Sequence, residues 1–222
     1  MKKNKVKKIV KKSKTINEIL KENNQGIKLD IGCGTRKQDG FVGMDIRKAP
    51  GVDIVQNLER FPWSLPDKSV SVATASHVLE HINPMLPDPK IVALINLLKT
   101  KKILSDKEIK DYIGEYDHFG TFIRFMNEVW RILKTKGRFA FVVPYAGSPG
   151  FFQDPTHINA INEATLAYFD PLDLSGLWSI YKPYPWKVVQ SSWNNGGNLE
   201  VILEKRLIDK NYQPDLETYE KK

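Results

Sequence analysis

An apolar strand that runs directly into a glycine turn constrains this chain more than any other feature. The apolar run from Ile27 to Ile31 is followed at once by Gly32-Cys33-Gly34. Because the two glycines have no Cβ, a ligand can approach the backbone closely. The next predicted strand, at 41–46, carries Asp45 near its end, where a carboxylate can accept both hydroxyls of a ribose. The pattern therefore predicts a nucleoside site at one edge of a parallel sheet.

The same turn lacks the features that hold a pyrophosphate. The dinucleotide fingerprint requires a third glycine where Lys37 stands, and the sequence has no Walker loop. We therefore expect a nucleoside-like ligand without a pyrophosphate, which disfavours both nicotinamide cofactors and ATP.

Apolar runs alternate with helical stretches along the chain, which predicts a parallel sheet with crossover helices. Further strands are predicted at 52–56, 69–75 and 139–143, together with a helix at 121–134 that Gly137 ends. Two late strands, at 186–193 and 199–205, flank Asn194-Asn195-Gly196-Gly197. Asn-Gly predicts a hairpin in which both turn residues adopt positive φ. The hairpin would close an otherwise parallel sheet with an antiparallel strand.

The positive charge is concentrated at the N-terminus. The formal charge is +8, and eight of the 34 basic residues are lysines within the first 14 residues, where no acidic residue occurs. The rest of the chain carries equal numbers of basic and acidic side chains. A lysine tail of this kind attracts nucleic acid or an anionic membrane surface, and the alternative is a solubilising, partly helical extension.

The chain divides into three parts on its composition. We predict a basic, partly helical extension at 1–24, one domain at 25–205 and a polar tail at 206–222. Three prolines and two helix-like stretches, 91–98 and 106–116, predict a helical insertion at 83–118, either a lid or padding. The single cysteine, Cys33, excludes an internal disulfide, and no apolar run is long enough to cross a bilayer. A reducing, cytoplasmic location is predicted.

Five ordered motifs between residues 27 and 205 resemble those of the class I S-adenosylmethionine-dependent methyltransferases. They are Asp-Ile-Gly-Cys-Gly-Thr (30–35), Gly-Met-Asp-Ile (43–46), and the segments 58–67, 76–82 and 127–138. The short segment 35–40 is similar to that of the small subgroup with a very short first helix. The resemblance implies an α/β fold with a doubly wound, mostly parallel, seven-stranded Rossmann-like sheet, an antiparallel last strand and three layers. It also implies methyl transfer to an oxygen, nitrogen or carbon acceptor.

The resemblance assigns roles in binding S-adenosylmethionine position by position. Asp30 and the backbone from Gly32 to Gly34 would hold the methionine end, and Asp45 would take the ribose hydroxyls. The other cofactor contacts that it implies are Cys33 within the turn, Ile46 beside Asp45, Asn57 and Leu58 at the adenine, and Ser76 beside the sulfonium.

The loop after the strand at 139–143 is the predicted substrate side, because ligands of open α/β sheets bind at the carboxyl ends of the strands. The loop begins with Tyr145 and ends in Asp154-Pro-Thr-His157. We predict His157, oriented by Asp154, as the first candidate for a general base and His77 as the second. Tyr145 and Asp154 are predicted substrate contacts. Alternatively, Asp154 begins a turn and His157 caps a helix.

The segment from His77 to His81 also matches H-x-x-E-H, the inverted zinc-protease motif. In that motif both histidines lie on one helical face, and a third protein ligand comes from further along the chain. The methyltransferase resemblance accounts for the same residues without a metal, so no metal is predicted.

The methyl acceptor is expected to be a small molecule or a glycan. A second hypothesis is a non-catalytic binding or scaffold module of the same fold, whose lysine tail contacts nucleic acid or a protein partner. Deleting residues 1–14 would distinguish the two, because the remaining chain is charge-neutral.

Overall fold

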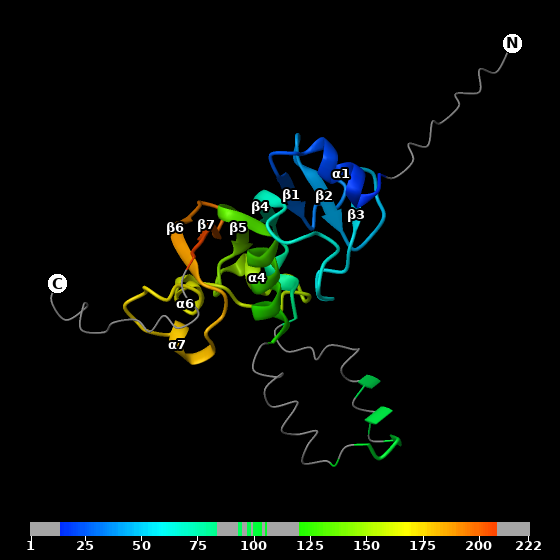
Figure 1. Cartoon of the computed structure of the whole chain (residues 1–222). Helices are drawn as coiled ribbons and strands as arrows, with labels where there is room; N and C mark the ends of the chain where they lie inside the picture. The colour runs from blue at the N-terminus through cyan, green and yellow to red at the C-terminus, as the bar shows by residue number, and fades with distance from the viewer. Residues whose placement is uncertain are drawn as a thin grey trace, which may run out of the picture.

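A computed structural model describes residues 14–83, 93–94, 97–98, 100–103, 105 and 120–207 of the chain. Its sheet contains β1 (Ile27–Ile31), β2 (Val42–Asp45), β3 (Ile54–Val55), β4 (Val70–Ser76), β5 (Leu133–Pro144), β6 (Trp186–Trp193) and β7 (Asn198–Lys205). The strand order is β3-β2-β1-β4-β5-β7-β6. Every pairing is parallel except the two that β7 makes, with β5 and β6 (Figure 1). The predicted doubly wound sheet with a reversed last strand is confirmed.

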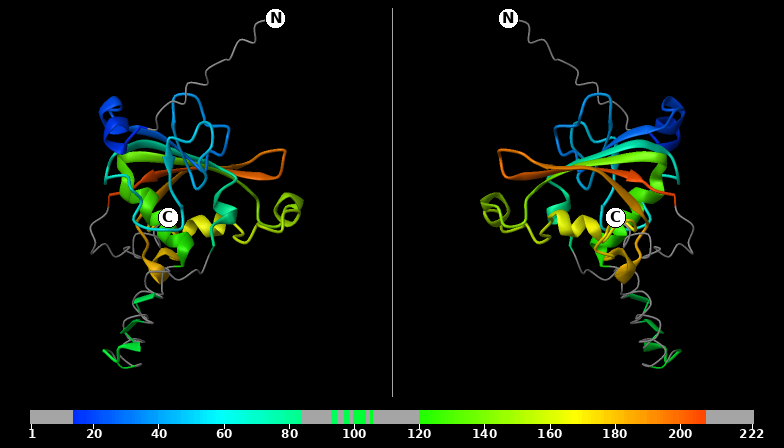
Figure 2. Two further views of the ribbon diagram at one scale, coloured as in Figure 1. Left: turned by 90° about the vertical axis from the view of Figure 1, so that its right-hand side faces the viewer. Right: turned by 90° about the vertical axis from the view of Figure 1, so that its left-hand side faces the viewer.

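Helices flank the sheet on both faces (Figure 2). On one face lie α4 (Thr121–Ile132), α6 (Glu163–Ala167) and α7 (Trp178–Tyr181), and on the other lies α1 (Ile16–Glu22). Two short elements, the 3-10 helix η1 (Leu79–His81) and α5 (Pro149–Phe152), lie beyond the carboxyl ends of β4 and β5. A capping box starts α1: the Thr15 hydroxyl accepts from the Glu18 N–H, and the Glu18 carboxylate accepts from the Thr15 N–H.

The two faces of the sheet differ in how well they are covered. Alternate side chains of β5 and β7 are buried against the side that carries α4, because side chains point to opposite faces along a strand. The intervening residues remain partly exposed, and above them lies a hollow of about 570 Å³. The buried side is formed by Phe139, Phe141, Val143, Leu199, Val201 and Leu203 from the strands and by Phe125, Met126 and Val129 from α4.

Two local predictions are wrong in their details. The helix α4 ends at Ile132 rather than at Lys134, because Leu133 adopts extended dihedrals and pairs with Val70 to begin β5, the strand in which Gly137 lies. The hairpin between β6 and β7 is confirmed, but of its two glycines only Gly197 has a positive φ, +77°. The Gly197 N–H donates to Asn194 O, so a different turn type from the predicted one closes the hairpin.

Within the described residues, no helix is both long enough and apolar enough to cross a membrane. Most of the predicted insertion at 83–118 lies outside the described residues, as do residues 1–13 of the predicted extension and residues 208–222 of the predicted tail. The part of the extension that is described contributes α1, whose Ile19 is buried in the core. Between Thr35 and Gly40 there are only turns and irregular backbone, in agreement with the very short first helix that the resemblance implies.

Candidate functional site

A hollow of about 550 Å³ opens at the carboxyl ends of the parallel strands. The connections run outward in opposite directions from β1 and β4, so this edge is the topological switch point of the sheet. Such switch points are where open α/β sheets bind their ligands. The hollow, called here the cofactor hollow, is lined by Gly32, Gly34, Asp45, Ile46, Arg47, Asn57, Leu58, Glu59, His77, Val78, His81, Ile82 and Thr156.

The two glycines of the turn have different physical roles. Both adopt positive φ, +67° at Gly32 and +53° at Gly34, which other residues rarely do. A Cβ on Gly32 would lie 2.4 Å from Cγ2 of Val78, whereas a Cβ on Gly34 would meet nothing within 4 Å. Gly32 is therefore required for packing against the segment after β4. Gly34 leaves open space over the turn in which a ligand can lie.

Asp45 ties together the loops after β1 and β2. Its buried carboxylate accepts from the Gly34 N–H (2.9 Å, Oδ2) and from the Arg47 N–H (3.0 Å, Oδ1). An ionised carboxylate has about four acceptor positions, so these two bonds leave capacity for further donors. Asp45 therefore faces the cofactor hollow as an acceptor held in place by the backbone.

The predicted cofactor residues are divided between two hollows that share Gly32. Six of them line the cofactor hollow: Gly32, Gly34, Asp45, Ile46, Asn57 and Leu58. The others, Asp30, Cys33 and Ser76, line with Gly32 the second hollow on the open face of the sheet. The two groups meet at the glycine turn, so an elongated ligand would pass along that turn.

In the second hollow, burial raises the pKa values of two side chains. Burial raises the pKa of Asp30, although its Oδ2 accepts from the Gln38 N–H at 2.8 Å. Burial, together with the charges of Asp30 and Asp45, raises the pKa of the Cys33 thiol to about 11. The thiol therefore stays protonated at neutral pH and is not a nucleophile.

His77 lies on the wall of the cofactor hollow in a left-handed conformation, with φ +54°. A non-glycine residue in this region costs about 1–3 kcal/mol and is retained only where the surroundings fix it. Here the His77 N–H donates to Val142 O (2.9 Å), and His77 Nδ1 lies 3.1 Å from Oε1 of Glu80. Glu80 is completely buried, so it holds the imidazole of His77 toward the hollow.

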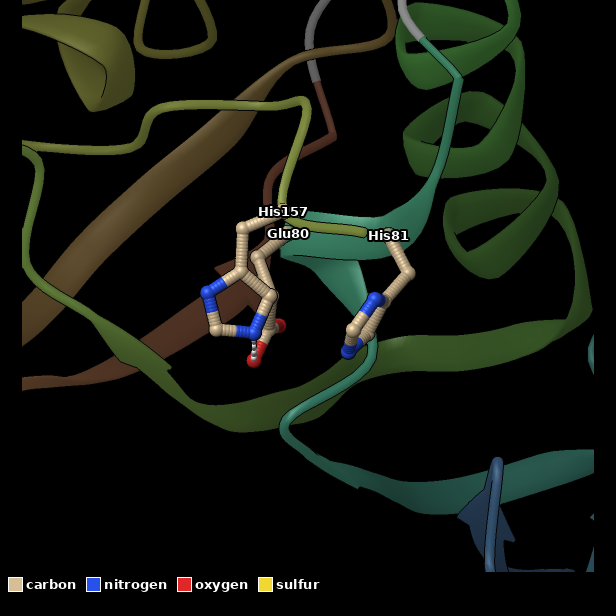
Figure 3. Close-up of side chains that lie close together, drawn as sticks. All are labelled: Glu80, His81 and His157. Carbon is tan, nitrogen blue, oxygen red and sulfur yellow. Dashed lines mark ion pairs between the residues drawn. The ribbon is translucent and has the colours of Figure 1, made fainter. Parts of the chain in front are cut away.

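The loop that carries His157 docks onto η1. Backbone N–H groups of Ile158 and Asn159 each donate to Glu80 O at 3.0 Å, and the Asn159 amide donates to Leu79 O at 3.1 Å. The docking places His157 Nε2 4.0 Å from Glu80 Oε1, with the His157 side chain 8% exposed (Figure 3).

Asp154 does not orient His157 through a hydrogen bond. Its Oδ2 lies 3.7 Å from His157 Nε2, while its Oδ1 accepts from the N–H and hydroxyl of Thr156 at 2.8 and 2.7 Å. His157 Nδ1 instead lies 2.9 Å from Phe151 O, which fixes the ring. Asp154 begins a turn, as the alternative interpretation held, but Asn162 rather than His157 caps α6.

Tyr145, the other predicted substrate contact, lines neither hollow. Its ring lies against that of Trp193, with the ring centroids 3.6 Å apart.

The inverted zinc-protease motif would require His77 and His81 to share one helical face, and the structure does not show this. η1 spans only Leu79–His81, and His77 precedes it with a positive φ, so the two histidines do not share an α-helical face. His81 instead pairs with His157, their ring centroids 4.8 Å apart. The sequence analysis did not predict Glu80 or His81 as site residues, although both belong to the H-x-x-E-H pattern.

Comparisons with known proteins find structural similarity only. No family model and no curated protein matches the sequence. Among solved structures, a SAM-dependent methyltransferase from Aquifex aeolicus is 13% identical, with 86% of this chain and 89% of that chain covered and a TM-score of 0.45. One from Archaeoglobus fulgidus is 14% identical (85% and 94% covered, TM-score 0.44). A putative type 11 methyltransferase from Sulfolobus solfataricus is 17% identical (90% and 94% covered, TM-score 0.42).

The strand order, with β7 alone reversed, is itself that of the class I methyltransferase fold.

Proposed function

We propose that this protein is an S-adenosylmethionine-dependent methyltransferase. The observation that carries the proposal is the cofactor hollow. It lies at the topological switch point and combines an open glycine turn with a buried, backbone-held carboxylate. A fold alone does not specify a function, so the proposal depends on the chemistry of this site.

The lining of the two hollows suits the parts of the cofactor. Asp45 would accept from the ribose hydroxyls, and Asn57 and Leu58 would meet the adenine on the same side. The methionine end would follow the turn past Gly32 toward Asp30 and Ser76. The turn lacks the third glycine of the dinucleotide-binding fingerprint, which disfavours a cofactor with a pyrophosphate.

Methyl transfer is an in-line displacement. A lone pair of the acceptor forms the new bond to the methyl carbon as the carbon–sulfur bond breaks, and the sulfur keeps that electron pair in S-adenosylhomocysteine. Catalysis therefore comes mainly from alignment of the acceptor, methyl and sulfur. A hydroxyl acceptor must also lose a proton. His77 is the better placed of the two predicted bases, because it lines the cofactor hollow and Glu80 orients it. His157, the first candidate from the sequence, becomes the second because it does not line that hollow.

Ligand-dependent thermal unfolding tests the cofactor. A ligand at a hundred times its dissociation constant adds about 2.7 kcal/mol to the free energy of unfolding, a rise in Tm of roughly 5–11 °C for a chain of this size. We expect S-adenosylmethionine and S-adenosylhomocysteine to produce this rise and NAD to produce none. A rise with NAD alone would contradict the proposal, and no rise with any of the three would favour the scaffold hypothesis.

The acceptor is proposed to be a small molecule or a glycan that reaches the methyl from the His77 side of the cofactor hollow. A cytoplasmic location and a nucleic-acid contact of the lysine tail stay predictions from the sequence. Radioactive methyl transfer from labelled S-adenosylmethionine into pools of hydroxylated small molecules and oligosaccharides would identify the acceptor class. Incorporation into RNA alone would contradict the proposed class.

A further inference from the structure

The carboxylate of Glu80 is buried, and the contacts around it do not offset the cost of removing its charge from water. Its side chain is 0% exposed, and Oε1 contacts His77 Nδ1 at 3.1 Å. Within the part of the chain that the structure describes, Oε2 has no hydrogen-bond partner. Burying an ionised oxygen without a donor or a cation is costly. A cation bound by the Glu80 carboxylate would compensate for this burial.

Two imidazoles next to Glu80 are held by their Nδ1 atoms. His157 Nδ1 lies 2.9 Å from Phe151 O, and His81 Nδ1 lies 3.2 Å from Thr156 O and 3.0 Å from its hydroxyl oxygen. The Thr156 hydroxyl donates to Asp154 Oδ1, so its oxygen can accept from His81. These contacts favour the tautomer with a proton on Nδ1, which leaves a lone pair on each Nε2. Histidines that bind metals are held in this way by a carbonyl or carboxylate behind the ring.

The three side chains converge on one point. One ligand atom from each of Glu80, His81 and His157 lies within 4.8 Å of the other two, and Figure 3 shows the rings and the carboxylate directed toward a common space. Asp154 Oδ2, 3.7 Å from His157 Nε2, adds a second negative charge beside them. Two neutral imidazoles and a carboxylate, with a further carboxylate nearby, match the charge of a divalent cation.

We propose that Glu80, His81 and His157 bind a divalent first-row transition metal ion such as Zn²⁺, Mn²⁺ or Fe²⁺. Nitrogen and carboxylate ligands in this ratio suit these ions better than Mg²⁺ or Ca²⁺, which prefer oxygen. His157 takes the ligand position that the H-x-x-E-H pattern alone would give to His77. Three protein ligands leave a position for water or an acceptor oxygen, and His81 and Thr156 open the site onto the cofactor hollow.

The test uses the untagged full-length chain, stripped with a chelator and titrated with Co²⁺, whose visible absorption reports nitrogen ligation. Zn²⁺ is then added to displace the Co²⁺. We expect one tightly bound ion per chain. Glu80→Gln, His81→Gln and His157→Gln should each weaken binding by roughly 100-fold or more, because ligand loss exceeds the 10–100-fold cost of losing a supporting contact. Glu163→Gln, a carboxylate that binds Trp193 outside both hollows, is the control and should bind like the wild type.

His77→Gln distinguishes this site from the inverted zinc-protease motif. The proposal predicts that this variant still binds the ion, because His77 is not one of the three proposed ligands and touches them only through its contact with Glu80. Loss of binding in His77→Gln with full binding in His157→Gln would overturn it in favour of the motif. No Co²⁺ spectrum at millimolar metal, or binding unchanged in His81→Gln, would overturn it outright. His81 is exposed, so its variant remains informative if Glu80→Gln fails to fold. None of these readouts requires S-adenosylmethionine, so the metal site and the proposed function can fail separately.

Discussion

The cofactor hollow and the histidine cluster (Glu80, His81 and His157) are neighbours that are built in different ways. The cofactor hollow is formed largely by backbone turns at the ends of successive strands, where glycine conformation and the Asp45 bonds to Gly34 and Arg47 fix the shape. The histidine cluster depends on side chains from two loops far apart in the sequence, joined by hydrogen bonds from residues 158–159 to η1. The first is therefore specified locally, while the second exists only once the chain has folded.

The substitution with the largest expected effect, Gly32→Ala, tests whether the glycine turn fixes the shape of the cofactor hollow. Gly32→Ala places a Cβ 2.4 Å from Val78 at a positive φ, so steric overlap adds to backbone strain. We expect it to lower the free energy of unfolding by about 2–5 kcal/mol and to abolish cofactor binding. Chemical denaturation and calorimetric titration with S-adenosylhomocysteine measure the two effects.

Gly34→Ala is the matched control for Gly32→Ala. It also has a positive φ but nothing within 4 Å of the new Cβ, so only the strain of about 1–2 kcal/mol remains. Equal destabilisation by the two substitutions would show that Val78 packing does not fix the turn.

Asp45→Ala should have the next largest effect. It removes the carboxylate that is proposed to hold the ribose and that binds the Gly34 and Arg47 N–H groups. Charged hydrogen bonds contribute about 1.5–3 kcal/mol, so S-adenosylmethionine affinity should fall roughly 10- to 150-fold. Co²⁺ binding by the same variant should stay at the wild-type level. A parallel loss of both would mean that the hollow and the cluster are one structural unit.

Asn159→Ala probes the docking on which the histidine cluster depends. The substitution deletes the 3.1 Å bond from the Asn159 amide to Leu79 O, which joins the His157 loop to η1. We expect Co²⁺ affinity to fall about 10-fold, the size of a lost supporting contact, while S-adenosylmethionine affinity is retained. Unchanged Co²⁺ affinity would show that the backbone bonds to Glu80 O suffice.

The effect expected to be smallest near pH 9 is a pH dependence of the stability on the cofactor side. Burial raises the pKa of Cys33 from 9.0 to about 11 in the folded state. When folding raises the pKa of a group, the stability that this group contributes is fully present below its pKa in the unfolded chain. That contribution is lost as the pH rises toward the pKa in the folded protein. Stability should therefore decline between pH 9 and pH 11, by less than about 1 kcal/mol in the first half unit. Denaturation of Cys33→Ala across this range should lack that part of the decline.

The sequence predicts the fold well because its signals are local. β1 and β6 have the predicted bounds, and the Asn-Gly hairpin is present. The end of α4 was mispredicted because Leu133 is drawn into pairing with Val70, a contact between residues far apart in the sequence. The turn type was also mispredicted: the Asn194 side chain accepts from the N–H groups of Gly196 and Asn198, and Gly197 rather than the Asn-Gly pair adopts the positive φ.

For the site, the sequence predicted which residues lie close together where the backbone itself brings them together. Gly32, Gly34 and Asp45 lie together because parallel strands end at one edge of the sheet. The sequence did not predict that Asp30, Cys33 and Ser76 line a separate hollow. That hollow lies on the open face of the sheet, and which face stays open depends on how the helices pack. Nor could the sequence pair His81 with His157, since no spacing rule relates residues so distant along the chain.

By itself, the sequence determined three features of the fold: a glycine turn after the first strand, an acidic residue at the end of the second and an antiparallel last strand. Only the tertiary structure decided that Glu80 is fully buried with His157 beside it. The reason is physical. Backbone conformation follows from neighbouring residues, whereas burial and side-chain convergence follow from which distant surfaces the folded chain brings into contact.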